Sequence, residues 1–167
     1  GFILIPSSTN LTEKDIEYRF KTVFPQVVIA DLANAAKIDT AEKLLSKSVK
    51  VKIIVDGELE GWHNFKEIYK EEKESDAAYT RADDNLFYFF TSGTTGLPKI
   101  VTHTHLTLPF GHVTTSVWLG LRHGDIHYNI SAPGWAKFAY SSFFGPWNMG
   151  VTVFANQVDK FIPKEQL

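Results

Sequence analysis

Short apolar runs alternate with helix-favouring segments along the chain, and this alternation constrains the fold more than any other sequence feature. The apolar runs predict strands at residues 2–5, 27–30, 51–55, 86–90, 100–104, 126–130 and 151–154. Strands that alternate with helices of ordinary length predict βαβ units. We therefore expect an α/β fold of three layers, with a mainly parallel sheet and helices on both faces.

Helix signals fill most of the intervals between these runs. Thr12-Glu13-Lys14-Asp15 resembles a capping box and predicts a helix through Phe24. The segment 31–48 favours a helix through its alanine, leucine and lysine, with Asp39-Thr40 as a second N-cap. Further helices are predicted over residues 65–73, 106–121 and 140–149.

Composition limits the classes of function. Lysine plus arginine number 17 and aspartate plus glutamate 19, so the net charge of −2 gives no footprint for nucleic acid or an anionic membrane. No apolar run approaches the roughly 20 residues that span a bilayer. The absence of cysteine excludes disulfides, thiolate metal sites and a cysteine nucleophile. It is compatible with a reducing compartment, and we expect a cytoplasmic protein.

The 167 residues fit one domain of ordinary size. The chain starts on an apolar run, Phe2-Ile3-Leu4-Ile5, without a basic region or an initiator methionine, and it stops at Leu167 without a cap. We therefore expect residues 1–167 to be part of a longer domain, cut at both ends.

The segment with the clearest chemistry is Thr91-Ser92-Gly93-Thr94-Thr95-Gly96-Leu97-Pro98-Lys99, between two apolar runs. Glycines let backbone N–H groups come close to an anion. Hydroxyls of Thr91, Ser92, Thr94 and Thr95 can donate to phosphate oxygens, and Lys99 adds a positive charge. This composition predicts a phosphate-binding loop.

The loop differs from the common nucleotide-binding motifs. Only Thr94 and Thr95 separate Gly93 from Gly96, and Ile100 follows Lys99, so the spacing of the P-loop is missing. The fingerprint G-x-G-x-x-G is also missing. From residue types alone, a turn-rich hairpin without a ligand remains an alternative.

The stretch from Tyr88 to Lys99 resembles the signature of the adenylate-forming superfamily, which includes acyl-CoA synthetases, luciferases and the adenylation domains of peptide synthetases. In that family the loop is mobile and contacts the β- and γ-phosphates of ATP. The resemblance therefore implies an ATP-binding role, which it assigns to Thr91, Ser92, Gly93, Thr94, Thr95, Gly96 and Lys99.

Two further stretches are similar to the medium-chain acyl-CoA synthetase branch. They are Ser131–Lys137, continuing through Phe143–Gly150, and Ile5-Pro6 with Leu11–Arg19. The tryptophan of the Gly-Trp pair lines or gates the acyl pocket in relatives, which makes Trp135 the candidate substrate-binding residue. A core aromatic packed between helix and sheet is the alternative interpretation.

The resemblance implies a ligase that activates a carboxylic acid, including fatty acids, with ATP and Mg²⁺ and then transfers the acyl group to coenzyme A. Its expected partners are these small molecules and the remainder of its own N-terminal AMP-binding domain. The parts that relatives use for adenine, ribose, Mg²⁺ and catalysis, including the C-terminal domain, would follow Leu167.

We therefore expect no catalytic residue and no metal ligand in this segment, which would be inactive alone. A non-catalytic nucleotide or phosphate-binding module and an inactive truncated product are the alternatives.

Other polar and aromatic residues have simpler interpretations. On a strand His103 and His105 would share a face, but residues with suitable ligand spacing are missing nearby, which favours core-edge or solvated histidines. Asp83-Asp84 indicates a polar approach to a strand. Core packing is expected for four aromatic residues, which are Trp118, Phe143, Phe144 and Trp147.

Overall fold

The computed structural model describes residues 1–70, 74–92, 96–156 and 164, and the chain falls into two units. One unit runs from Thr9 to Ala77. The other combines Gly1–Ser8 with the segment from Ala78 onward. Each unit has its own hydrophobic core, so each is described separately.

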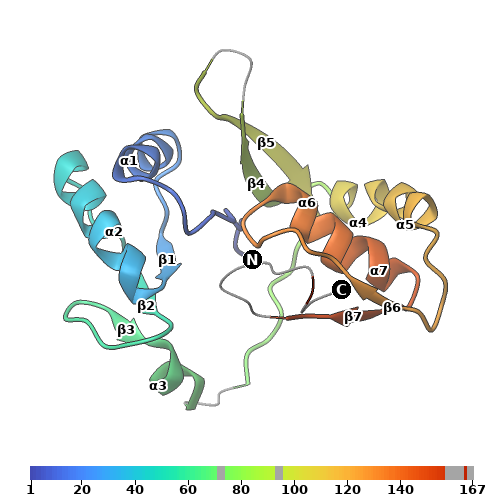
Figure 1. Cartoon of the computed structure of the whole chain (residues 1–167). Coiled ribbons are helices and arrows are strands. Elements are labelled where there is room, and N and C mark those ends of the chain that lie inside the picture. Colours follow the sequence, from blue (N-terminus) through green and yellow to red (C-terminus); the bar gives the residue numbers. More distant parts are fainter. Residues whose placement is uncertain (71–73, 93–95, 157–163, 165–167) are drawn as a thin grey trace. The chain divides into compact units, whose positions relative to one another are not determined.

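Parallel strand pairing defines the unit of residues 9–77 (Figure 1). Its sheet has the order β1-β2-β3, with both pairings parallel. Its elements are α1 (Glu13–Thr22), β1 (Val27–Ala30), α2 (Leu32–Leu45), β2 (Val51–Ile54), β3 (His63–Asn64) and α3 (Phe65–Lys70). The α/β class and the parallel pairing expected from the alternating pattern are thus confirmed.

The predicted capping box is present at the start of α1. The Thr12 hydroxyl accepts from the Asp15 N–H at 3.3 Å, and the Asp15 carboxylate accepts from the Thr12 N–H at 2.8 Å. These reciprocal bonds satisfy two N–H groups that have no partner inside the helix. The Thr12 hydroxyl also donates to the Asp15 carboxylate at 2.7 Å, and this bond, together with the one from the Thr12 N–H, lowers the pKa of Asp15.

The predicted second N-cap at Asp39-Thr40 is wrong. Helix α2 begins after Asp31, whose carboxylate accepts from the Asn34 N–H at 2.8 Å, and it continues through Asp39 without a break. The Asp39 carboxylate instead lies 2.7 Å from Lys52 Nζ on β2 and accepts from the indole of Trp62 at 3.2 Å. The aspartate joins the helix to the sheet rather than starting a new helix.

Helices α1 and α2 share one core with the sheet. Ile16 of α1, Ile38 of α2 and Ile54 of β2 are buried in this cluster, and Ile54 is fully buried. Val28 and Ala30 of β1 also pack against this core. Because side chains alternate between the two faces of a strand, Ile29 between them points to the other face, where it is 60% exposed.

The second unit holds a hairpin, a helical layer and a two-stranded parallel sheet (Figure 1). Strands β4 (Asn85–Thr91) and β5 (Lys99–Thr104) pair antiparallel, whereas β6 (Ile126–Tyr128) and β7 (Thr152–Phe154) pair parallel. The helices are α4 (Thr107–Gly111), α5 (Val113–Leu119), α6 (Ala136–Ala139), the π-helix η1 (Tyr140–Phe144) and α7 (Gly145–Asn148). The helix predicted over 106–121 is therefore interrupted at His112.

The predicted buried strand at residues 2–5 is reduced to one parallel bridge, between Leu4 and Phe87. The Leu4 N–H donates to Leu86 O and the Tyr88 N–H donates to Leu4 O, both at 2.9 Å. Phe2, Ile3 and Leu4 are exposed within the described residues. The apolar run does pair beside β4, but its side chains lie outside the core.

Truncation of Ile54 tests the core of residues 9–77. Ile54→Ala removes a fully buried side chain and should lower the free energy of unfolding by about 2–5 kcal/mol, because the lost apolar contacts leave a cavity. Leu44→Ala on the exposed face of α2 is the control and should change stability by less than about 1 kcal/mol. Urea unfolding curves measure both, and equal losses would contradict this core.

Candidate functional site

The predicted phosphate-binding segment connects the two strands of the β4–β5 hairpin. Thr91 is the last residue of β4 and pairs with Lys99, the first residue of β5. The Thr91 hydroxyl lies 3.5 Å from Lys99 O. The end of the hairpin that carries this pair projects away from helices α4–α7 of the same unit (Figure 1). The expectation that the loop joins two neighbouring strands is confirmed.

Four of the seven predicted phosphate-binding residues are described. Thr91 is half-buried, Ser92 and Lys99 are exposed, and Gly96 has φ 93°, a left-handed conformation that favours glycine. Gly93, Thr94 and Thr95 lie outside the described residues.

The hairpin is anchored by one apolar face. Phe87 and Phe89 are buried on β4, and their rings stack with centroids 5.2 Å apart. They form a core cluster with Leu108 of α4 and Ala139 of α6. Because side chains repeat every second residue along a strand, Thr91 continues this same face beyond the core. Its cross-strand neighbour Lys99 shares that face.

The helix that follows Trp135 packs on the same cluster. Ala136, the first residue of α6, and Phe144 of η1 are half-buried against it. One core therefore holds both the strand that leads to the predicted phosphate-binding loop and the start of the helix after Trp135. Trp135 itself is 62% exposed, so it is not a core aromatic of the described residues.

Gly134 brings this turn against the first residues of the chain. Its φ of 95° is left-handed, and an added Cβ would lie 2.6 Å from the carbonyl carbon of Ser7 and from the N of Ser8. Only glycine permits both this backbone conformation and this close approach. Ile5-Pro6 and Gly134-Trp135, two stretches with family resemblance, thus lie in neighbouring parts of one unit.

A row of rings connects the hairpin to the π-helix. His103 of β5 makes an edge contact with Phe89 at 5.7 Å between ring centroids and lies 6.3 Å from His112. His112 stacks on Tyr140 at 4.3 Å, and its Nδ1 lies 3.2 Å from the Thr115 hydroxyl. Burial lowers the pKa of His103, and burial together with the charge of His103 lowers the pKa of His112.

The histidine pair considered in the sequence is not a pair on a strand. Strand β5 ends at Thr104, so His105 lies outside it and the shared face with His103 is lost. No group of three His, Cys, Asp or Glu side chains able to hold a metal occurs among the described residues. Asp83 and Asp84 bind Arg81, as expected for a polar turn before a strand.

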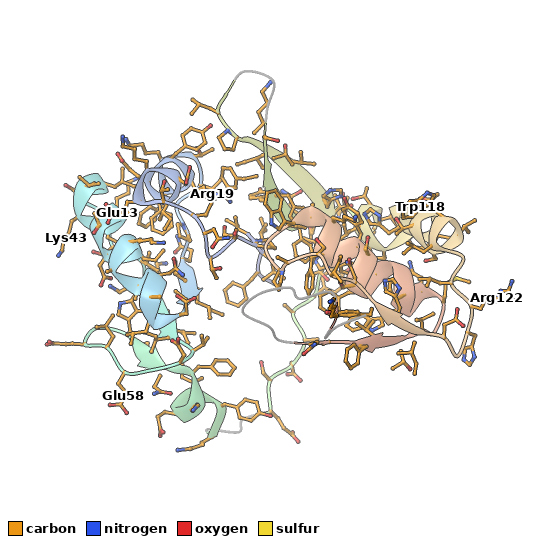
Figure 2. All side chains as sticks on the ribbon, viewed as in Figure 1. Glu13, Arg19, Lys43, Glu58, Trp118 and Arg122 are labelled. Atoms are coloured by element: carbon orange, nitrogen blue, oxygen red, sulfur yellow. The ribbon has the colours of Figure 1, made fainter. Side chains whose placement is uncertain are left out.

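Two tryptophans assigned to the core are in fact exposed. Trp118 on α5 is 77% exposed (Figure 2) and Trp147 on α7 is 61% exposed. Phe144 does pack against the core cluster, and Phe143 is half-buried beside Trp147. Residue type and spacing could not indicate which face of each short helix is covered.

Comparison with known proteins assigns the family. The model of the AMP-binding enzyme family matches residues 1–166. The chain is 42% identical over 153 residues to 4-hydroxybutyrate–CoA ligase 1 of Metallosphaera sedula, covering 92% of this chain and 26% of that protein. It is 38% identical over 163 residues to the mitochondrial acyl-coenzyme A synthetase ACSM3 of Mus musculus, covering 96% and 28%.

Solved structures share the fold. An acyl-CoA synthetase of Brucella canis superposes with a TM-score of 0.75 at 31% identity, over 92% of this chain and 28% of that one. The anthranilate CoA ligase AuaEII, in complex with anthranoyl-AMP, gives a TM-score of 0.78 over 90% and 30%, and its 24% identity supports the fold alone. The chain belongs to the AMP-binding enzyme family, and it spans about a quarter of the length of the curated relatives cited here.

The contact at Gly134 yields a stability prediction. Gly134→Ala should destabilise the protein more than Gly124→Ala, because both glycines have positive φ but only Gly134 has backbone atoms within van der Waals distance of a new Cβ. Backbone strain alone costs about 1–3 kcal/mol, and the clash adds to it. Thermal unfolding of the two variants measures the difference. Equal midpoints would contradict the close approach of Ser7.

The lowered histidine pKa values predict a loss of stability in acid. The unfolded chain, with histidine pKa values of about 6.5, binds more protons than the folded chain as the pH falls below that value. Stability is therefore full above about pH 6.5 and declines below it. His112→Phe keeps a ring on Tyr140 but cannot titrate, so its thermal midpoint should fall less between about pH 7.5 and about pH 5.5. An unchanged decline would show that His112 contributes nothing to it.

Proposed function

We propose that the protein containing this chain is an AMP-forming carboxylic acid–CoA ligase, and that this chain supplies its ATP phosphate-binding loop. The observation that carries the proposal is the family signature on a hairpin whose base packs on the core that also holds the helix after Trp135. The named relatives that support it are CoA ligases or acyl-CoA synthetases.

The proposed reaction has two steps. A carboxylate oxygen attacks the α-phosphorus of ATP, forming acyl-AMP as the bond to pyrophosphate breaks. The sulfur of coenzyme A then attacks the acyl carbon, releasing AMP and forming the thioester. Negative charge on the departing pyrophosphate requires donors that are already in position. The hydroxyls of Thr91 and Ser92 and the ammonium of Lys99 are such donors, and Gly93 to Gly96 complete the proposed phosphate site.

Mg²⁺ accompanies ATP in enzymes that transfer phosphoryl or adenylyl groups. Since the described residues contain no group of acidic or histidine side chains that fits a metal ion, we assign this ion no ligand here. None of the helices in the described part of the chain is both long and apolar enough to cross a lipid bilayer. The cytoplasmic location stays a prediction, since the mouse relative is a mitochondrial protein.

Trp135 is the proposed residue for the acyl part of the substrate. Trp135 is exposed and lies a short loop after the carboxyl end of β6, which pairs parallel with β7. Ligands of α/β proteins bind beyond the carboxyl ends of parallel strands, which supports this role. The names of the relatives specify different acids, among them 4-hydroxybutyrate and anthranilate. A panel of 4-hydroxybutyrate, butyrate, hexanoate and benzoate in the pyrophosphate-exchange assay would rank them.

Replacement of Lys99 tests the phosphate site. In the full-length protein, Lys99→Ala should slow acid-dependent exchange of pyrophosphate into ATP by about ten- to a hundredfold, because a hydrogen bond to a charged group contributes roughly 1.5–3 kcal/mol. Transfer from preformed acyl-AMP to coenzyme A should change much less.

Lys70→Ala is the control and should leave both steps unchanged, because Lys70 is exposed on α3 and forms an ion pair with Glu67 of the same helix. Full-speed exchange in Lys99→Ala would remove Lys99 from the site. Wild-type protein that binds ATP but shows no exchange with any acid would instead indicate a non-catalytic nucleotide-binding module.

A further inference from the structure

The helix after Trp135 contains an unusual turn with a clear cause. Helices α6, η1 and α7 follow one another without a break, and the central segment is a π-helix in which the Gly145 N–H donates to Tyr140 O, five residues back. Proline inside a helix lacks an N–H, and its ring clashes with the carbonyl four residues earlier. The wider π turn accommodates Pro146 at this place.

This turn leaves one carbonyl without a donor from the helix. The N–H four residues after Ser141 belongs to Gly145, which donates to Tyr140 O. The next residue, Pro146, has no N–H. Ser141 is buried, and a buried carbonyl without a partner is costly.

His127 supplies the missing donor from another element. Its Nε2 lies 2.9 Å from Ser141 O. A carbonyl oxygen only accepts, so Nε2 carries the hydrogen, and this holds for both the neutral and the charged ring. The side chain of His127 therefore satisfies the carbonyl that the π turn leaves open.

A second bond next to it makes a two-point connection between strand and helix. The Asn129 side-chain amide donates to the Ser142 hydroxyl at 3.0 Å. His127 lies on β6, and Asn129 follows that strand directly. The chain leaves β6, turns through Gly134 and Trp135, and returns as the helix that these two side chains hold.

Trp135 is the N-cap residue of that helix, and its carbonyl accepts from the Phe138 N–H at 3.0 Å. At about 1.5 Å of rise per residue, Trp135 lies roughly 9 Å from Ser141 along the helix axis. A shift of the helix against β6 would move Trp135 with it, because the intervening turns are bonded.

We propose that His127 is a positioning residue for the acyl site: by binding Ser141 O it fixes the π turn against β6 and thereby sets the place of Trp135. This role rests on the proposed ligase activity and deepens it. It acts on the acid rather than on ATP, because the bond lies in the helix behind Trp135 and not in the β4–β5 hairpin.

The test compares two substitutions at His127 in the full-length protein. His127→Leu keeps bulk but removes the donor, whereas His127→Gln keeps a side-chain N–H. In His127→Leu we expect the KM for the acid to rise about tenfold, because a displaced Trp135 would bind the acyl group less well. The KM for ATP should change less than about twofold. His127→Gln should restore most of the loss.

Ser116→Ala is the matched control. The Ser116 hydroxyl donates to Gly145 O at 2.6 Å, so this variant also removes a donor from a carbonyl of the same helix, but beyond the π turn. It should lower the thermal midpoint without changing the KM for the acid. An unchanged acid KM in folded His127→Leu, or a loss that His127→Gln does not repair, would overturn the proposal.

Amide hydrogen exchange separates this proposal from the proposed activity. Amide exchange across residues 136–148 should become faster in His127→Leu and return toward the wild-type rate in His127→Gln. Unchanged exchange would show that the bond from His127 to Ser141 O does not fix the helix. Wild-type protein without acid-dependent pyrophosphate exchange would overturn the ligase assignment and the effect on the acid, whatever the amides show.

Discussion

The packing of Phe87 and Phe89 against the helices is the interaction on which the candidate site depends. These two rings are buried among Leu108, Ala139 and Phe144. A two-stranded hairpin alone is marginally stable in water, and it becomes secure only when an apolar face is covered. The exposed end of the hairpin can then present hydroxyls and a lysine to solvent without itself contributing to the core. Core packing and the proposed phosphate binding thus lie at opposite ends of the same pair of strands.

The same core also explains why the second candidate region belongs with the first. Ala136 packs on the cluster directly after Trp135, so the helix that positions the tryptophan and the strand that leads to Thr91 are held by common contacts. Elsewhere on the helix, His112 stacks on Tyr140 and His127 binds Ser141 O. Neighbouring residues of the π turn are therefore fixed from two different elements. A helix widened by an internal proline needs such external partners, because its own backbone no longer satisfies every carbonyl.

Local signals in the sequence predicted local structure well. The capping box at Thr12 and the strands on both sides of the predicted phosphate-binding loop depend on neighbouring residues, and each was found where expected. The errors all involve tertiary context. Asp39 resembled an N-cap, yet its carboxylate binds Lys52 and Trp62 from other elements. Trp118 has a large apolar side chain of the kind often found in a core, yet it is exposed. Which side of a short helix is covered depends on the elements packed around it.

The π turn and His127 show which part of a site sequence reasoning misses and which signal was available. The available signal is Gly145-Pro146 inside the helix predicted over residues 140–149, since proline cannot continue the hydrogen-bond pattern. The sequence could not identify the donor, because His127 lies fourteen residues from Ser141 and only the fold brings the two together. A residue whose side chain donates to a buried backbone carbonyl belongs to no recognisable sequence motif. Its importance follows only from an accounting of hydrogen-bond donors and acceptors in three dimensions. In this chain the proposed phosphate-binding loop is recognisable from its residue types, whereas the contacts that hold the helix after Trp135 emerge only from that accounting.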